Sequence, residues 1–166
     1  MVPHSTISSR IPLLFLEAVP QTVLAYAAGI IDGEGCIRIA CGRIKPGRTN
    51  VNTPYRLTVF VTNTNPAMIQ YLHQHFGGFV GKGNKARGNF RSTVRWTIAD
   101  RGAEQFLRLI EPYIVCKKEE IQLAYVFRAS FNRANWWCGN GLSVGVLELR
   151  DHCYQQMKAL HHLIYE

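Results

Sequence analysis

Polar and apolar side chains alternate in several stretches of the chain, and this alternation predicts strands with two different faces. Successive strand residues point to opposite sides of a sheet, so each stretch can be sorted into two sets. In 91–98 the two sets are Arg91, Thr93, Arg95 and Thr97 against Ser92, Val94, Trp96 and Ile98. The same alternation sets Arg56 and Thr58 against Leu57, Val59 and Val61, and Arg38 against Ile37 and Ile39. The sequence therefore predicts a sheet with an apolar face for helices and a basic face left open.

The periodicity of the other segments predicts an α+β domain with one antiparallel four-stranded sheet. Helices are expected over 21–32, 66–76, 101–110, 117–132 and 143–165, and strands over 36–44, 55–62, 79–85 and 90–99. Gly33 and Gly35 are expected to end the first helix, Pro66 to open the second and Asp100 to cap the third. The expected connections are a turn at Pro46-Gly47, a hairpin around Gly88-Asn89 and a loop at Trp136-Trp137.

These elements predict one domain over residues 21–166. Its core is expected over roughly 21–131, with C-terminal helices over 132–166 and an N-terminal extension over 1–20. No run of about 20 apolar residues is present, so the sequence predicts no membrane-spanning helix.

The net charge of the chain and its distribution indicate the class of binding partner. The 166 residues include 19 Lys and Arg against 11 Asp and Glu, which gives a formal net charge of +8. No acidic residue occurs between Gly35 and Ala99, where ten basic residues lie. A solvated surface normally mixes both signs, so this asymmetry favours a nucleic-acid partner.

The cysteines and histidines point away from other chemistry. The five cysteines are scattered at positions 36, 41, 116, 138 and 153, with no CxxC pair. This pattern argues against a disulfide framework and predicts an intracellular, reducing setting, either an organelle or a prokaryotic cytoplasm. No histidine pair has the i, i+4 spacing of a helical zinc site, so zinc is not expected.

Residues 27–35 read Ala-Ala-Gly-Ile-Ile-Asp-Gly-Glu-Gly, with Tyr26 before them and Cys36-Ile37 after them. This segment resembles the LAGLIDADG motif of homing endonucleases. It differs by Ala for the first Leu, Ile for the second Leu, Gly for the second Ala and Glu for the last Asp. The expected αββαββα order extends the resemblance over roughly 21–131. The resemblance implies a homing-endonuclease-like domain with a DNA-binding sheet, and an intron-encoded enzyme that makes a double-strand break.

The motif occurs once, and by resemblance this implies a homodimer in which two motif helices pack together. Small residues four apart on the first helix supply the face that such close packing needs. The expected interface residues are Ala25, Ala28, Gly29 and Gly33. The alternative is that these small residues serve helix packing within one chain.

The resemblance also assigns site residues. Glu34 is expected to bind a divalent cation, Mg²⁺ or another such as Mn²⁺, with the Gly33 carbonyl as a second ligand. Lys117 is expected to stabilise charge on the scissile phosphate, and Asn63 to position solvent. The structural alternatives are a solvated base at a helix start for Lys117 and a turn residue for Asn63. Asp32 is expected to serve local structure rather than to bind metal.

The expected partner is double-stranded DNA with a long, nearly palindromic site. The residues expected to contact it are Arg38, Arg56, Thr58, Lys82, Lys85, Arg87, Arg91, Thr93, Arg95 and Thr97. Two alternatives with the same fold stay open. One is a maturase, which binds RNA and assists intron splicing, and the other is a DNA-binding regulator that does not cleave.

Overall fold

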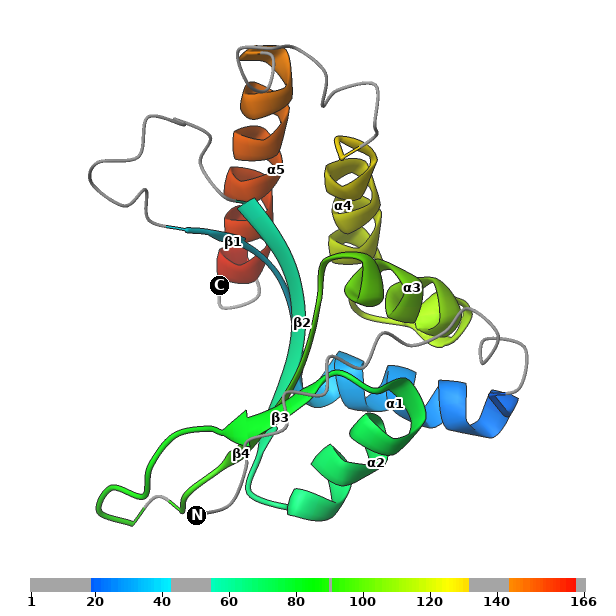
Figure 1. Ribbon diagram of the computed structural model, residues 1–166, viewed down its shortest axis with the longest axis vertical. Helices are drawn as coiled ribbons and strands as arrows, with labels where there is room; N and C mark the ends of the chain where they lie inside the picture. Colours follow the sequence, from blue (N-terminus) through cyan, green and yellow to red (C-terminus); the bar gives the residue numbers. More distant parts are fainter. Residues whose placement is uncertain (1–18, 43–54, 90, 132–143, 164–166) are drawn as a thin grey trace, which may run out of the picture.

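A computed structural model describes residues 19–42, 55–89, 91–131 and 144–163. In these ranges one curved sheet carries helices on one side (Figure 1). The elements in chain order are α1 (Gln21–Glu34), β1 (Gly35–Cys41), β2 (Tyr55–Asn63), α2 (Pro66–Phe76), β3 (Phe79–Lys82), β4 (Val94–Ala99), α3 (Asp100–Ile110), the short 3₁₀ helix η2 (Glu111–Tyr113), α4 (Lys118–Ala129) and α5 (Val144–Leu163).

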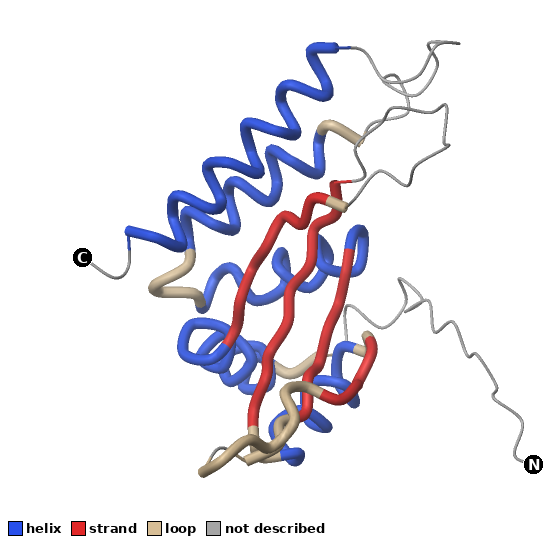
Figure 2. The backbone as a smooth tube through the Cα atoms, turned by 90° about the vertical axis from the view of Figure 1, so that its left-hand side faces the viewer, coloured by secondary structure: helices blue, strands red, loops and turns tan. Residues whose placement is uncertain are grey.

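The four strands form one antiparallel sheet in the order β1-β2-β4-β3. Gly35 pairs with Val61, and Val61 also pairs with Trp96, so the end of α1 lies level with the end of β2 and the start of β4. The α+β class and the four-stranded antiparallel sheet expected from the sequence are confirmed. Figure 2 shows the strands in front of α1, α2 and α3, with their other side uncovered by the described helices.

The core lies between the sheet and these helices. Its sheet side is the apolar set of alternating residues, all buried: Ile37, Ile39, Leu57, Val59, Val61, Trp96 and Ile98. From α1 the core takes Ala27, Ala28, Ile30 and Ile31. The buried Trp96 indole donates a hydrogen bond from Nε1 to the Gly77 carbonyl, 2.7 Å away, so its one polar group is satisfied. The predicted division of the sheet into two faces is confirmed.

Helices α4 and α5 pack against each other and against β1, at the end of the sheet away from α2 (Figure 1). The buried Arg150 of α5 links them, since its Nε donates to Ser130 Oγ and its Nη2 to the Ser130 carbonyl. Its guanidinium also lies 3.7 Å from the centre of the Phe131 ring. None of the helices in the described ranges combines the length and apolar character needed to span a bilayer.

Several element ends differ from those expected. Helix α1 continues through Gly33 and ends at Glu34, and Gly35 caps it with an N–H that bonds to the Ile30 and Ile31 carbonyls. A Cβ at Gly35 would lie 2.7 Å from the Ile31 backbone, which explains the glycine there. Strand β4 begins only at Val94, so Arg91 and Thr93 lie outside it. The Pro46-Gly47 turn and the Trp136-Trp137 loop lie outside the described residues.

Asp100 was expected to cap α3, and this expectation is wrong. The residue before the helix is Ala99, and Asp100 is the first helical residue, with φ at +53°. Aspartate tolerates this left-handed conformation better than most residues. Its carboxylate instead accepts a hydrogen bond from Arg56 Nε at 2.9 Å, so a contact between β2 and α3 takes the place of a local cap.

Candidate functional site

The site is built around the last turn of α1. Glu34 is exposed there, and its carboxylate forms no hydrogen bond or ion pair with any described residue. Gly33 beside it is also exposed, and a Cβ added to it would meet no atom within 4 Å. The last carbonyl groups of a helix have no partner within the helix. The helix therefore ends in a carboxylate without a partner among the described residues, next to the exposed Gly33.

Asp32 connects this helix end to the loop ahead of α4. Its Oδ2 accepts a hydrogen bond from the Val115 N–H at 2.8 Å, and its Oδ1 accepts from the Cys116 and Lys117 N–H groups, both at 3.3 Å. The expected structural role of Asp32 is confirmed. Its partners lie more than eighty residues away in sequence, however, so the role is a tertiary contact rather than a local one.

Lys117 reaches the same end of α1. Its Nζ donates a hydrogen bond to the backbone carbonyl of Asp32 at 2.5 Å, and the side chain is half-buried. Lys117 stands just before α4, where a cation is unfavourable, but its ammonium lies at the C-terminal end of α1, where a cation is favourable. The structure therefore brings Lys117 and Glu34 together at one helix end.

Replacing Asp32 with asparagine is expected to lower the free energy of unfolding by about 1 to 3 kcal/mol. The two carboxylate oxygens accept hydrogen bonds from three backbone N–H groups, and an amide has only one oxygen that can accept them. Urea unfolding measures this change. Asp151→Asn is the matched control, since Asp151 accepts one hydrogen bond from the Tyr55 hydroxyl and an amide oxygen can still accept it. Equal stability losses in the two variants would contradict the role of Asp32 in holding the 115–117 loop.

Asn63 takes the turn role. Its Oδ1 accepts a hydrogen bond from the Asn65 N–H at 2.8 Å, and Asn65 in turn caps α2 by accepting from the Ala67 N–H. This alternative is therefore confirmed, and the positioning of solvent by Asn63 stays a prediction. The neighbouring Thr62, which sequence reasoning missed, pairs with Arg95 and accepts a hydrogen bond from Arg95 Nε at 2.9 Å. Only the strand register could have identified it.

The side of the sheet that the helices leave free, here called the open face, is ordered into rows by the register. Directly paired residues share a face, so each row runs across the strands. From the Glu34 end outward the rows are Thr62–Arg95–Gly81, Cys36–Phe60–Thr97–Phe79, Arg38–Thr58–Ala99 and Ala40–Arg56. Arg38, Arg56, Thr58, Arg95 and Thr97 are thus placed together on the open face.

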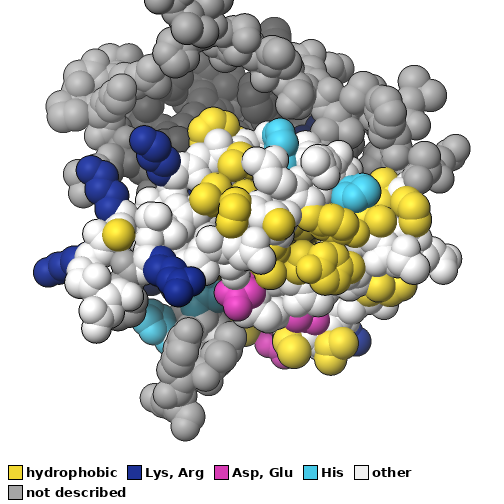
Figure 3. Space-filling view, turned by 90° about the horizontal axis from the view of Figure 1, so that it is seen from below, with side chains coloured by type: hydrophobic (Ala, Val, Ile, Leu, Met, Phe, Trp, Pro, Cys, Tyr) yellow, Lys and Arg dark blue, Asp and Glu magenta, His cyan; other side chains and the backbone are white. Residues whose placement is uncertain are grey.

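The remaining basic residues lie elsewhere. Lys82 pairs with Val94 and so points to the opposite side of the sheet from Arg95. Lys85, Arg87 and Arg91 are exposed in the connection between β3 and β4, which extends beyond the Glu34 end of the sheet. Figure 3 shows Lys and Arg side chains gathered on the side of this connection, apart from a hydrophobic surface. Thr93 there serves the connection itself, since its Oγ1 accepts from the Asn84 N–H at 2.7 Å.

Two charge effects act on the open face. The Arg95 guanidinium lies 4.6 Å from the centre of the Phe60 ring, a distance that allows a cation–π contact. Burial raises the pKa of the Cys36 thiol, while the nearby positive charges of Arg38 and Lys117 lower it to a lesser extent. The thiol is therefore neutral at physiological pH. Cys36, Cys41, Cys116 and Cys153 are all unpaired, within the part of the chain that the structure describes.

The exposed side of α1 carries most of the expected interface residues. Ala25, Gly29 and Gly33 are exposed, and a Cβ at Gly29 would meet nothing within 4 Å. Ala28 is 0% exposed and belongs to the core, so its assignment to an interface is wrong. The reason is the helical period, which turns Ala28 toward the sheet. Tyr26, 52% exposed, stands beside this surface and packs edge-on against Tyr71 of α2.

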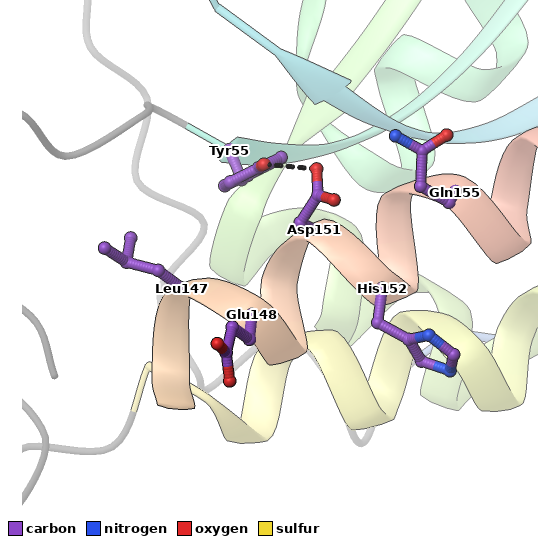
Figure 4. A pocket seen from close by; sticks show the side chains of 6 residues that line it. All are labelled: Tyr55, Leu147, Glu148, Asp151, His152 and Gln155. Carbon is purple, nitrogen blue, oxygen red and sulfur yellow. Dashed lines mark hydrogen bonds between the residues drawn. The ribbon is translucent and has the colours of Figure 1, made fainter. Parts of the chain in front are cut away.

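A separate hollow lies between β2 and α5, lined by Tyr55, Leu147, Glu148, Asp151, His152 and Gln155 (Figure 4). The Tyr55 hydroxyl donates a hydrogen bond to Asp151 Oδ1 at 2.7 Å. Burial is the main cause that raises the pKa of Tyr55, and this hydrogen bond raises it further. Tyr55 begins β2, whereas the Glu34 site lies level with the end of that strand. The hollow is therefore not part of the candidate site.

Comparison with known proteins gives matches only in structure: no protein-family model and no curated protein matches the sequence. The homing endonuclease I-CvuI in complex with its target, in the presence of Ca, has a TM-score of 0.68 at 16% identity, covering 84% of this chain and 82% of that one. The archaeal intron-encoded homing endonuclease I-Vdi141I, complexed with DNA, gives 0.63 at 15% identity and 82% coverage of both chains. The homing endonuclease I-TnaI gives 0.57 at 18% identity, covering 85% of this chain and 97% of that one. At such low identity the likeness concerns the fold, and this chain has the fold of the LAGLIDADG homing endonucleases.

Proposed function

We propose that this chain is a DNA endonuclease that cuts both strands of a long, nearly palindromic site as a homodimer. One observation carries the proposal. The Glu34 carboxylate, unpaired in the described part of the chain, and the Lys117 ammonium, which bonds to the Asp32 carbonyl, both lie at the end of α1. This helix end is level with the edge of an open sheet face that presents Arg38, Arg56 and Arg95. This arrangement places acidic and basic groups suited to phosphodiester hydrolysis next to a surface suited to duplex DNA.

The residues at the helix end fit a hard divalent cation, Mg²⁺ or Mn²⁺. Glu34 and the Gly33 carbonyl offer oxygen atoms, the ligands that such cations prefer. Within the described ranges no three His, Cys, Asp or Glu side chains lie close enough to form a metal site, so the remaining ligands would be water, phosphate or groups of a second copy. When bound, the cation polarises the scissile phosphate and lowers the pKa of an attacking water.

The chain's own side chains supply positioning and charge. The Lys117 ammonium is held at the Asp32 carbonyl, from where it can stabilise negative charge that develops on the phosphate. Asp32 fixes the 115–117 loop and therefore the start of the Lys117 side chain. The open face fixes the duplex, with Arg and Thr side chains in the major groove.

Two copies complete the site by symmetry. A single chain offers one Glu34, and cutting two strands calls for one carboxylate at each. The exposed small residues Ala25, Gly29 and Gly33 allow two α1 helices to approach closely. Strand β2 has nine residues, so at roughly 3.3 Å per residue the open face is on the order of 30 Å long. That length covers about nine base pairs per copy.

Replacing Arg95 with alanine is expected to relax base preference at two symmetric positions, by about 1 to 3 kcal/mol each, because a bidentate contact to guanine is lost. Replacing Lys85 with alanine is expected to weaken DNA binding evenly across sites and to reduce its salt dependence. Lys85 is exposed outside the strands, where it can contact the phosphate backbone. Binding profiles over randomised half-sites measure both. Uniform weakening by both variants would show that the open face does not read bases.

The proposal is tested by selecting bound duplexes from a randomised library and incubating the selected DNA with the full chain, with Mg²⁺ and with EDTA. Mg²⁺-dependent double-strand cleavage within the selected site is expected. Selective binding without cleavage would instead support a regulator. Preference for structured RNA over every duplex would support a maturase, although the narrow major groove of A-form RNA does not admit a sheet.

A further inference from the structure

One row of the open face carries no charged side chain. It consists of Cys36, Phe60, Thr97 and Phe79, paired across all four strands. The row before it contains Arg95 and the row after it contains Arg38. A row of uncharged residues, two of them aromatic, thus lies between rows that contain Arg95 and Arg38.

Phe79 is the exposed member of this row. Its side chain is on a strand at the sheet edge and is 70% exposed, so the core does not account for it. A Cβ at Gly81 would lie 2.7 Å from Phe79 Cε1, which shows that one edge of the ring lies over Gly81. Gly81 pairs with Arg95, so the ring lies on the open face next to Arg95. The glycine is what makes room for the ring.

Phe60 has a different role within the row. The Arg95 guanidinium stacks over its ring while Arg95 Nε donates to Thr62. Arg95 is therefore held in place by two neighbours before any DNA binds, which lowers the entropy cost of using its outer N–H groups. The result is two adjoining contact points on the open face, a fixed cation at Arg95 and an apolar spot at Phe79 and Thr97.

We propose that Phe79, together with the Thr97 methyl group, recognises the C5-methyl group of a pyrimidine in the major groove of bound DNA. This inference rests on the proposed function. The charge around the row selects duplex DNA as the occupant, and in its major groove unmodified G, C and A present polar groups at their edges while thymine presents a methyl group. A 5-methylcytosine presents the same methyl group, so both bases share the chemistry that this spot recognises.

The register also gives the position of this base. Neighbouring rows are two residues apart along the strands, or roughly 6.6 Å, and base pairs are spaced by 3.4 Å. The Arg95 row is nearer the Glu34 end than the Phe79 row. Phe79 starts one row farther out, but its ring lies over Gly81 of the Arg95 row, so the recognised methyl group is within about two base pairs of the base that Arg95 contacts.

The first test selects bound duplexes from randomised half-sites with the full chain, in buffer without divalent cations. The proteins compared are the wild type, Phe79→Ala, Phe79→Leu and Arg95→Ala, with Val126→Ala as the control because Val126 is an exposed apolar residue of α4. Phe79→Ala is expected to lose a thymine preference within about two base pairs of the position that Arg95→Ala affects. Phe79→Leu should retain part of it, and Val126→Ala all of it.

The second test uses the selected duplex with single-base replacements at that position. Deoxyuridine, which lacks the methyl group, is expected to weaken wild-type binding about fourfold, the scale of one buried methyl group. A change of the T·A pair to 5-methyl-C·G should restore binding relative to C·G, and neither change should affect Phe79→Ala. If the deoxyuridine duplex binds as well as the thymine duplex, and 5-methyl-C·G binds no better than C·G, another group of the base is read and the methyl assignment is wrong.

The outcomes of these tests distinguish the failure of this inference from the failure of the proposed function. Selective binding in which Arg95→Ala changes base preference, but Phe79→Ala and deoxyuridine change nothing, overturns the role of Phe79 and leaves the proposed function standing. Failure of the wild type to select any duplex sequence overturns the proposed function itself.

Discussion

Replacing Glu34 with glutamine is expected to abolish DNA cleavage while leaving specific DNA binding nearly unchanged. Glutamine keeps the shape of the side chain but loses the charge that holds a hard cation. Glu34 is exposed and has no partner among the described residues, so the change costs the fold little. Cleavage should fall by at least about 100-fold, the scale of loss when even an outer partner of a metal ligand is removed.

Cleavage rates at several Mg²⁺ concentrations and binding measured on the same duplex check this prediction. Glu148→Gln is the matched control, because Glu148 is exposed on α5 and lines the hollow that lies apart from the site. Its cleavage should equal that of the wild type. Wild-type cleavage by Glu34→Gln would remove Glu34 from the site.

Replacing Gly29 with leucine is expected to separate the dimer. Gly29 lies in the exposed surface of α1 with no atom within 4 Å of an added Cβ, so leucine fits the single chain. In the proposed dimer the same space is occupied by the other copy. Steric crowding costs about 1 to 3 kcal/mol per side chain and counts twice by symmetry, so dimerisation should weaken by at least about 30-fold.

Analytical ultracentrifugation over a range of concentrations measures this change, and urea unfolding shows whether the single chain stays folded. Gly145→Leu is the matched control, since Gly145 is also helical and also has no atom within 4 Å of an added Cβ, but lies on α5. An unchanged dimer in Gly29→Leu would place the interface on another surface.

The features predicted most accurately are those that residues close together in sequence determine, such as helix ends and the two faces of the sheet. Helix α2 begins and ends at the expected residues because Asn65 caps it, Pro66 suits its first turn and Gly77 adopts a positive φ after it. The two faces of the sheet follow from alternation alone. Glu34 came from the motif and Lys117 from the resemblance of the segment after the third helix, and the structure places both at one end of α1.

Long-range contacts set the parts that the sequence did not predict. The contact between Arg56 and Asp100 joins β2 to α3 and removes the expected cap. The pairing of Thr62 with Arg95, and the place of Phe79 beside them, depend on the register between strands. Register is fixed by tertiary packing, and a shift by one residue would move each side chain to the other face. Sequence patterns therefore identified the open face but not its rows.

The central claim is that two copies act together, each cutting one strand with its own Glu34. A dimer that combines one wild-type chain and one Glu34→Gln chain, purified through two different affinity tags, tests it most directly on a supercoiled plasmid carrying one selected site. The account predicts that the wild-type dimer linearises the plasmid, whereas the mixed dimer stops at the nicked circle. Linear product from the mixed dimer at the wild-type rate would contradict it.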